Sequence, residues 1–230
     1  MLENIRAEAD LRGISRLCHF TSSANFLHVL RAAMLKDRAT LDSEANPVVN
    51  PTDALRLDGH TDKICCSVEY PNAYYLDTAR KKNLVFTDWI VVLLNPELLW
   101  QPGTVFCRRN AAAQNGMLIK PGEAGFKEMF WPEVDGAGGR RFTRAPRQLT
   151  CSTTDVQAEV LVPGPIPLAD VLGIIVQSQR QGETELARWE SLGLDSAGMK
   201  VAVAPTLFDK FTLGSQIRSG LRPPEATIAV

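Results

Sequence analysis

Residues 156–162 read VQAEVLV, a segment in which apolar and polar side chains alternate. Successive side chains of a β-strand point to opposite faces, so the valines and the alanine would share one apolar face and Gln157 and Glu159 the other. Because burying an unpaired charge is costly, Glu159 lies either on a solvated face or in a polar cavity. The segment therefore predicts a strand that presents one carboxylate.

The strands and helices expected around this segment belong to one domain. The most hydrophobic strand is predicted at 88–94 (DWIVVLL), buried on both faces and central. Further strands are expected at 14–20, 64–68, 104–108, 171–176 and 199–203, and helices after Ser22-Ser23, from Pro71 to Lys82, around 124–130 and over 183–192. With no internal repeat, we expect a single α+β domain over 1–213 and a loose C-terminal tail over 214–230.

Two long stretches lack clear periodicity. Residues 36–62 are polar and contain Pro47 and Pro51, and loops of that length inside a domain tend to be functional, so a ligand is expected there. Residues 136–148 read GAGGRRFTRAPRQ and carry Arg140, Arg141, Arg144 and Arg147 without an acidic residue. This run is either a solvated loop or a surface that meets phosphates and bases.

Composition and charge exclude several classes of protein. The chain is 45% hydrophobic and 22% charged, and no apolar run approaches the roughly 20 residues that span a bilayer. The N-terminus has mixed charge, so we expect no export and no membrane association. Five cysteines, without a C-x-x-C motif, favour a reducing cytoplasm and no metal site.

Several segments, taken in order, resemble the DarT-type ADP-ribosyltransferases, toxins of the ADP-ribosyltransferase superfamily that modify DNA bases. Gln157-x-Glu159 resembles the Gln/Glu-x-Glu element of the superfamily, and QAEVLVPGPIP (157–167) resembles the stretch that carries the catalytic glutamate in DarT enzymes. LCHFT (17–21) is similar to their His-x-Thr strand, CCSVEYPNAYYL (65–76) to their strand-Pro-Asn-helix segment, and NPELL (95–99) with VFCRRNAAA (105–113) to their central strand and Asn-Ala turn. The resemblance implies a single ADP-ribosyltransferase-like domain with a split, mixed β-sheet flanked by helices.

The resemblance also implies the chemistry at Glu159. Transfer of ADP-ribose from NAD⁺ breaks a glycosidic bond through an oxocarbenium-like transition state, which a nearby carboxylate stabilises. Glu159 would take that role by binding the ribose hydroxyl or accepting a proton from the attacking base nitrogen. Gln157 would orient the acceptor base through its amide, unless it is an ordinary exposed strand residue.

Other side chains would bind NAD⁺, which is a substrate; no metal is implied. His19 would hydrogen-bond the ribose or the nicotinamide amide, with Thr21 on the same strand face. Arg56 would grip the pyrophosphate as a catalytic partner of Glu159, although Arg38 competes for that assignment. The superfamily often has Ser-Thr-Ser where this chain has Cys65-Cys66-Ser67, so only Ser67 is carried over. Tyr74 or Tyr75 would stack on nicotinamide or else pack in the core.

Single-stranded DNA is the expected acceptor, because its bases are unstacked, and Arg140, Arg141, Arg144 and Arg147 would contact it. An RNA acceptor, a protein side-chain acceptor and a catalytically silent nucleic-acid or NAD⁺-binding module remain alternatives. The resemblance further implies a cytoplasmic toxin with a cognate antitoxin that removes ADP-ribose.

Overall fold

Strand β4 (Trp89–Leu94) is an interior strand of the main sheet, as its hydrophobic sequence predicts. In the computed structural model, which describes residues 2–44, 52, 56–83, 85–196 and 198–228, β4 lies between β1 (Leu17–Ser22) and β11 (Val171–Val176) and runs antiparallel to both. Ile90, Val91 and Val92 are completely buried, so the apolar side chains of β4 fill the space on both faces of the sheet.

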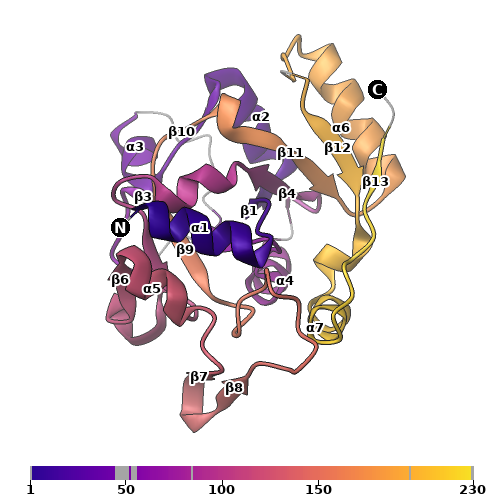
Figure 1. Cartoon of the computed structure of the whole chain (residues 1–230). Coiled ribbons are helices and arrows are strands. Elements are labelled where there is room, and N and C mark those ends of the chain that lie inside the picture. The colour runs from indigo at the N-terminus through magenta and orange to yellow at the C-terminus, as the bar shows by residue number, and fades with distance from the viewer. Residues whose placement is uncertain (1, 45–51, 53–55, 84, 197, 229–230) are drawn as a thin grey trace.

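Nine strands form the main sheet in the order β13-β12-β11-β4-β1-β3-β9-β5-β6 (Figure 1). Only β11 and β12 pair in parallel among the paired strands of the described chain, so the sheet is mixed and the predicted α+β class is confirmed. The strands not yet bounded are β3 (Lys63–Val68), β5 (Val105–Cys107), β6 (Ile119–Pro121), β9 (Glu159–Pro163), β12 (Lys200–Val203) and β13 (Ala226–Thr227).

The sheet splits between β1 and β3. These two strands pair at Leu17 with Val68 and at Cys18 with Ser67. From His19 onward β1 continues along β4, whereas the first four residues of β3 pair with β9. The two halves of the sheet therefore diverge from a shared seam, which is the split core implied by the resemblance.

Helices lie around this sheet (Figure 1). Helix α1 (Leu2–Arg12) packs on α5 (Gly122–Glu128), α6 (Gln179–Ser191) on β11 and β12, and α7 (Lys210–Arg218) on α4 (Ala73–Lys82). Helix α2 (Ser23–Ala32) follows β1 directly because Ser22 accepts a hydrogen bond from the backbone N–H of Asn25. Besides short 3-10 helices, the described chain also contains α3 (Arg38–Ser43), a pair β2 (Met34–Leu35) with β10 (Ile166–Pro167), and a hairpin β7 (Glu133–Asp135) with β8 (Arg141–Thr143).

The C-terminal region differs from the prediction of a loose tail. Helix α7 crosses position 214, because its apolar residues Leu213 and Ile217 stand one turn apart and are both buried. Strand β13 then pairs with β12, and Glu225 forms an ion pair with Arg16 at 2.5 Å. Long-range pairing, which local sequence does not reveal, holds this segment against the sheet.

Candidate active site

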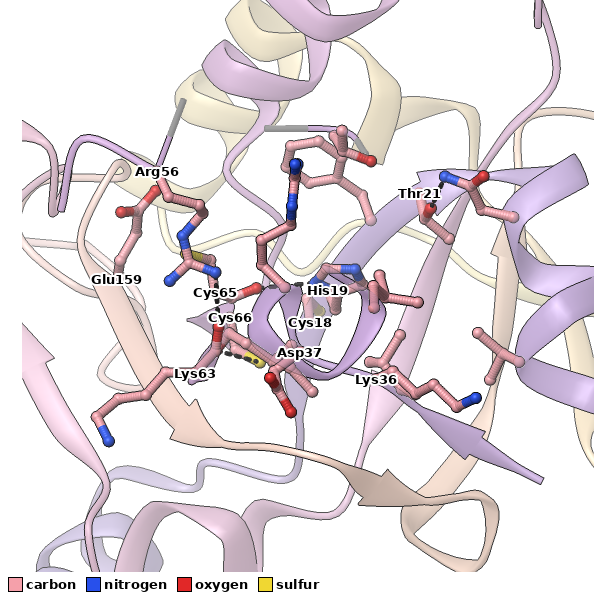
Figure 2. Close-up of a pocket in the computed structure, with 18 of the residues that line it drawn as sticks. Cys18, His19, Thr21, Lys36, Asp37, Arg56, Lys63, Cys65, Cys66 and Glu159 are labelled. Carbon is pink, nitrogen blue, oxygen red and sulfur yellow. Dashed lines mark hydrogen bonds between the residues drawn. The ribbon is translucent and has the colours of Figure 1, made fainter. Parts of the chain in front are cut away.

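A cavity of about 330 Å³ opens where β1 and β3 diverge (Figure 2). Residues of β1, α2, α3 and β3 form most of its wall, and Glu159 at the start of β9 completes it. The stretch 36–62, in which a ligand was expected, contributes Lys36, Asp37, Arg38, Leu41, Glu44, Thr52, Arg56 and Asp58 to the described lining. Residues 45–51 and 53–55 of that stretch lie outside the described residues.

Glu159 is buried, and hydrogen bonds fix its carboxylate. The backbone N–H of Ala111 donates to Oε2 at 2.7 Å, and the side-chain amides of Asn110 and Asn72 donate to Oε1 at 3.1 and 3.4 Å. Asn110 and Asn72 each use their amide oxygen to accept from a backbone N–H nearby, that of Ala112 and that of Tyr75. N–H donors suit a carboxylate rather than a carboxylic acid, so the arrangement favours a charged Glu159.

His19 bridges the split in the sheet. Its Nδ1 lies 2.8 Å from the carbonyl oxygen of Cys65, so Nδ1 carries the proton and donates (Figure 2). Burial lowers the pKa of His19, and the nearby charge of Arg56 lowers it further against the opposing hydrogen bond to Cys65. A neutral imidazole with a protonated Nδ1 leaves Nε2 as an acceptor toward a hydroxyl or amide of a ligand.

Thr21, Ser67 and Tyr75, which the resemblance proposes as NAD⁺ contacts, also line the cavity. Thr21 Oγ1 accepts from the side-chain amide of Asn25 at 3.2 Å. Ser67 donates its hydroxyl to the carbonyl oxygen of Cys18 at 3.3 Å, at the seam where β1 and β3 still pair. Ser67 therefore ties the two strands together at the edge of the cavity.

Arg56 reaches the cavity but is engaged by the protein. Its Nε and Nη2 donate to the two carboxylate oxygens of Asp58, at 3.1 and 2.9 Å, in a buried ion pair. Its guanidinium also donates to the carbonyl oxygens of Lys63, at 2.6 Å, and of His60. A bidentate carboxylate thus occupies the edge of Arg56 that a pyrophosphate would need.

Other basic side chains face the cavity. Lys36 pairs with Glu44 at 2.7 Å, Arg38 with Asp42 at 2.7 Å and Lys63 with Asp62 at 3.0 Å. Arg31, in the last turn of α2, is exposed and lines the same cavity. Several cations therefore surround a space whose inner wall is largely apolar.

The cysteines of the cavity are thiols. Burial raises the pKa of Cys18 to about 12. Burial, and next the negative charge of Glu159, raise the pKa of Cys65 well above its usual range. Neither side chain supplies a thiolate nucleophile, so Glu159 and His19 are the groups with suitable chemistry.

The structure places Gln157 and Tyr74 away from this cavity. Strand β9 starts at Glu159 rather than at Val156, because residues 155–158 form a turn in which Asp155 accepts from the backbone N–H of Gln157 at 2.9 Å. The expected shared strand face of Gln157 and Glu159 is therefore wrong. Of the two adjacent tyrosines, Tyr75 lines the cavity, whereas Tyr74 faces α7.

The arginine run divides by role. Arg140, Arg141 and Arg147 are exposed on and after the β7–β8 hairpin, where Arg141 pairs with Glu133 at 3.3 Å. Arg144 instead donates to the backbone carbonyls of Leu149 at 2.6 Å, Thr150 at 3.3 Å and Ser152 at 2.8 Å. Arg144 therefore organises the segment before Glu159 and does not offer its guanidinium to a ligand.

The sequence did not reveal that Asn72 and Asn110 contact Glu159 or that Asp58 lines the cavity. Both asparagines stood in segments already noted, one before the helix that starts after Pro71 and one in the Asn-Ala turn. An asparagine at a helix start or in a turn is expected to accept a hydrogen bond from a nearby backbone N–H, and each of these asparagines does so. Each asparagine also donates a hydrogen bond to Glu159, and this contact depends on β9, which is remote in sequence.

The described residues contain neither a metal-binding cluster nor a membrane-spanning helix. Among them, no group of three or more His, Cys, Asp and Glu side chains is placed to hold a metal ion. Nor does any helix in the described part of the chain have the length and apolar character to cross a membrane.

Comparisons with known proteins agree with this fold. A family model described as "ssDNA thymidine ADP-ribosyltransferase, DarT" matches residues 18–208. DarT of Thermus sp. 2.9 in complex with NAD⁺ superposes with a TM-score of 0.57 at 16% identity, covering 84% of this chain and 97% of that one. The same protein in complex with ADP-ribosylated single-stranded DNA gives 0.54 at 14% identity, covering 85% and 97%. Thermosipho africanus DarTG in complex with ADP-ribose gives 0.59 at 13%, covering 84% and 51%. At such identities the structures show a shared fold, and no curated protein matches the sequence.

Proposed function

The chain belongs to the DarT family of single-stranded-DNA thymidine ADP-ribosyltransferases, and from this premise we propose that the cavity holds NAD⁺ and that Glu159 directs ADP-ribose to thymine. The observation that carries the proposal is the carboxylate of Glu159, fixed by Ala111, Asn110 and Asn72 at the wall of the cavity. Three N–H donors offset the cost of burying this carboxylate, and a charged group held in this way beside a ligand-sized space is typical of a functional site.

The chemistry of the cavity suits a dinucleotide. Its volume of about 330 Å³ falls within the range of small-molecule sites, and aromatic and aliphatic side chains such as Phe20 and Tyr75 offer surfaces for the rings. Cations at its rim suit a pyrophosphate. Arg56 remains our candidate for that contact, because a phosphate can replace the carboxylate of Asp58 with the same bidentate geometry.

The proposed reaction exchanges one bond at ribose C1′ for another. The bond from C1′ to the nicotinamide nitrogen breaks, and its electron pair leaves with neutral nicotinamide. Positive charge on the ribose rises next to Glu159, while a ring nitrogen of thymine forms the new bond to C1′. Thymine in DNA has one ring nitrogen with a proton, N3, and Glu159 accepts that proton or steadies the ribose hydroxyl.

His19 and Thr21 position the substrate in this proposal. Neutral His19 presents Nε2 as an acceptor to the ribose or the nicotinamide amide, and Thr21 lies two residues further along the same strand face. Ser67 acts indirectly, because its hydroxyl already ties β3 to β1.

The acceptor strand is proposed to meet the exposed arginines of the hairpin region, Arg140, Arg141 and Arg147. The turn that contains Gln157 directly precedes Glu159, so Gln157 can still reach an acceptor base from outside the NAD⁺ cavity. Neutralising an arginine that contacts a phosphate of single-stranded DNA is expected to reduce the slope of log K against log salt concentration by about 0.7. Arg144 is excluded from this set by its backbone contacts.

We further propose that a cognate antitoxin removes the ADP-ribose and that the protein acts in the cytoplasm. The DarTG name of one structural neighbour and the toxins that the sequence resembles support the antitoxin. The five cysteines are free, and buried free thiols suit a reducing compartment.

The test is incubation with NAD⁺ and oligonucleotides that differ only at one base, followed by mass measurement of the oligonucleotide. We expect one ADP-ribose on the thymidine-containing strand and none with Glu159→Gln. Glu185→Gln, which alters another buried glutamate on α6, serves as the matched control and should retain transfer. Modification of RNA of the same sequence or of cell protein, with the DNA unchanged, would contradict the proposal.

A further inference from the structure

An aromatic and cationic cluster stands on the surface where α4 meets α7. The rings of Tyr74 and Phe211 pack edge to face with centroids 6.4 Å apart. The Nζ of Lys210 lies 5.5 Å from the centre of the Tyr74 ring and 5.2 Å from that of Phe211. Phe211 is 70% exposed and Tyr74 36%, so both rings remain open to solvent.

Positive charge dominates this face. Asp77 is shared by two ammonium groups, that of Lys210 at 2.6 Å and that of Lys81 at 2.9 Å, so the trio keeps one positive charge. Arg80, also on α4, adds another positive charge beside Phe208, whereas Asp209 adds one negative charge as the N-cap of α7. Exposed rings beside such a surplus match the bases and phosphates of a single strand.

The cluster lies near the chain segments that hold and precede Glu159. Tyr74 stands two residues after Asn72, whose amide donates to Glu159. A small hollow beside the cluster is lined by Tyr74 and Lys210 and also by Ser152, Thr153 and Val156, which belong to the segment that precedes Glu159. Tyr75 faces the NAD⁺ cavity instead, so the first turn of α4 separates the two surfaces.

We propose that Tyr74, Phe211 and Lys210 form a stacking site for a nucleotide of the acceptor strand that flanks the modified thymidine. This inference rests on the proposed function, because it assumes that single-stranded DNA approaches Glu159. It moves Tyr74 from the NAD⁺ contacts, where the sequence had placed it, to the nucleic-acid contacts. A flanking base would lie against the exposed rings, and its phosphate would meet Lys210.

The test compares Phe211→Ala with the parent protein in binding a fluorescent oligonucleotide. Loss of one base–aromatic contact is expected to weaken binding roughly 5- to 150-fold. The KM for the oligonucleotide should rise with kcat unchanged, and NAD⁺ affinity should stay the same. Phe211→Trp should retain binding, because any aromatic face can stack. Leu11→Ala, at a residue 82% exposed on α1, is the control for loss of an exposed apolar side chain.

Photo-crosslinking with bromouracil-substituted DNA adds a readout of position, and adducts on the α4 or α7 peptides would support the proposal. If the parent protein modifies DNA and Phe211→Ala binds it equally well, the stacking site is wrong while the proposed function stands, and the cluster is then a surface for a protein partner. If the parent protein neither binds nor modifies single-stranded DNA, the proposed function fails and this inference fails with it.

Discussion

Replacing Glu159 by glutamine removes the charge of the carboxylate with almost no change of shape. The native carboxylate accepts from Ala111 at 2.7 Å, Asn110 at 3.1 Å and Asn72 at 3.4 Å. A glutamine has one oxygen and one NH₂ group, so at least one of these N–H donors meets another donor. Leaving a buried donor unsatisfied lowers the free energy of unfolding by about 1–3 kcal/mol.

The effect on the reaction is expected to be larger than the effect on stability. A carboxylate about 4 Å from a ribosyl cation stabilises it by about 4 kcal/mol at an effective dielectric constant near 20. Loss of that interaction corresponds to a roughly thousandfold lower rate of the chemical step. NAD⁺ affinity should fall much less than the rate, because the positive charge moves from the nicotinamide ring onto the ribose beside Glu159 only as the bond breaks.

The assay is the single-turnover rate of ADP-ribose transfer at saturating NAD⁺ and oligonucleotide, with thermal unfolding measured on the same samples. Glu185→Gln is the matched control, because Glu185 is also buried and hydrogen-bonded, by Arg188 at 2.9 Å, but lies on α6. It should lose stability and keep the rate. A folded Glu159→Gln protein that transfers at the parent rate would refute the electrostatic role of Glu159.

Three further changes probe the groups around Glu159. Asn110→Ala removes one hydrogen bond to a charged group and should lower kcat/KM roughly 10- to 100-fold with NAD⁺ affinity retained, measured by steady-state kinetics; an unchanged kcat/KM would remove Asn110 from the site. Asp58→Asn removes the ion pair with Arg56, so NAD⁺ binding measured by calorimetry should become tighter if Arg56 binds the pyrophosphate. Weaker binding would mean that Arg56 only stabilises the conformation of its own loop. Because burial lowers the pKa of His19 from 6.5, the unfolded chain binds a proton that the folded protein does not, so stability should fall as the pH drops below about 6.5, by at most about 1.4 kcal/mol per pH unit. Urea titrations at several pH values should show that His19→Asn lacks this component; an identical pH dependence would contradict it.

The sequence prediction was reliable where it depended on local patterns of strands, namely a hydrophobic run or the alternation of side chains every two residues. The hydrophobic run at 88–94 identified an interior strand, and the two-residue period of β1 placed His19 and Thr21 in one cavity. The same reasoning failed at Gln157, because the side chain of Asp155 closes a turn two residues before β9 starts. When an aspartate side chain accepts a hydrogen bond from a nearby backbone N–H, it can form a turn in a segment whose sequence still alternates like a strand.

The partners of Glu159 could not be predicted, because they come from segments 48, 49 and 87 residues away in the sequence. Helical phase was a further difficulty: Tyr74 and Tyr75 are neighbours, and only the packing of α4 decides that Tyr75 lines the cavity. Arg144 shows the same dependence, since nothing in the arginine run distinguishes the side chain that folds back onto carbonyl groups.

The position of the site follows from the pairing of β3. One edge of β3 pairs with β9 from Lys63 to Cys66, and the other edge pairs with β1 only at Ser67 and Val68. The unpaired part of the second edge opens the cavity, which His19 spans by its bond to Cys65. The pairing with β9 stops at Val160, so Glu159 is the first residue of β9 beyond that ladder, and its opposite neighbour is Cys107 of β5. Strand pairing sets both where β3 separates from β1 and where β9 passes beyond β3. The positions of His19 and Glu159 relative to each other are therefore fixed by the sheet, and the surface loops can vary to select the acceptor.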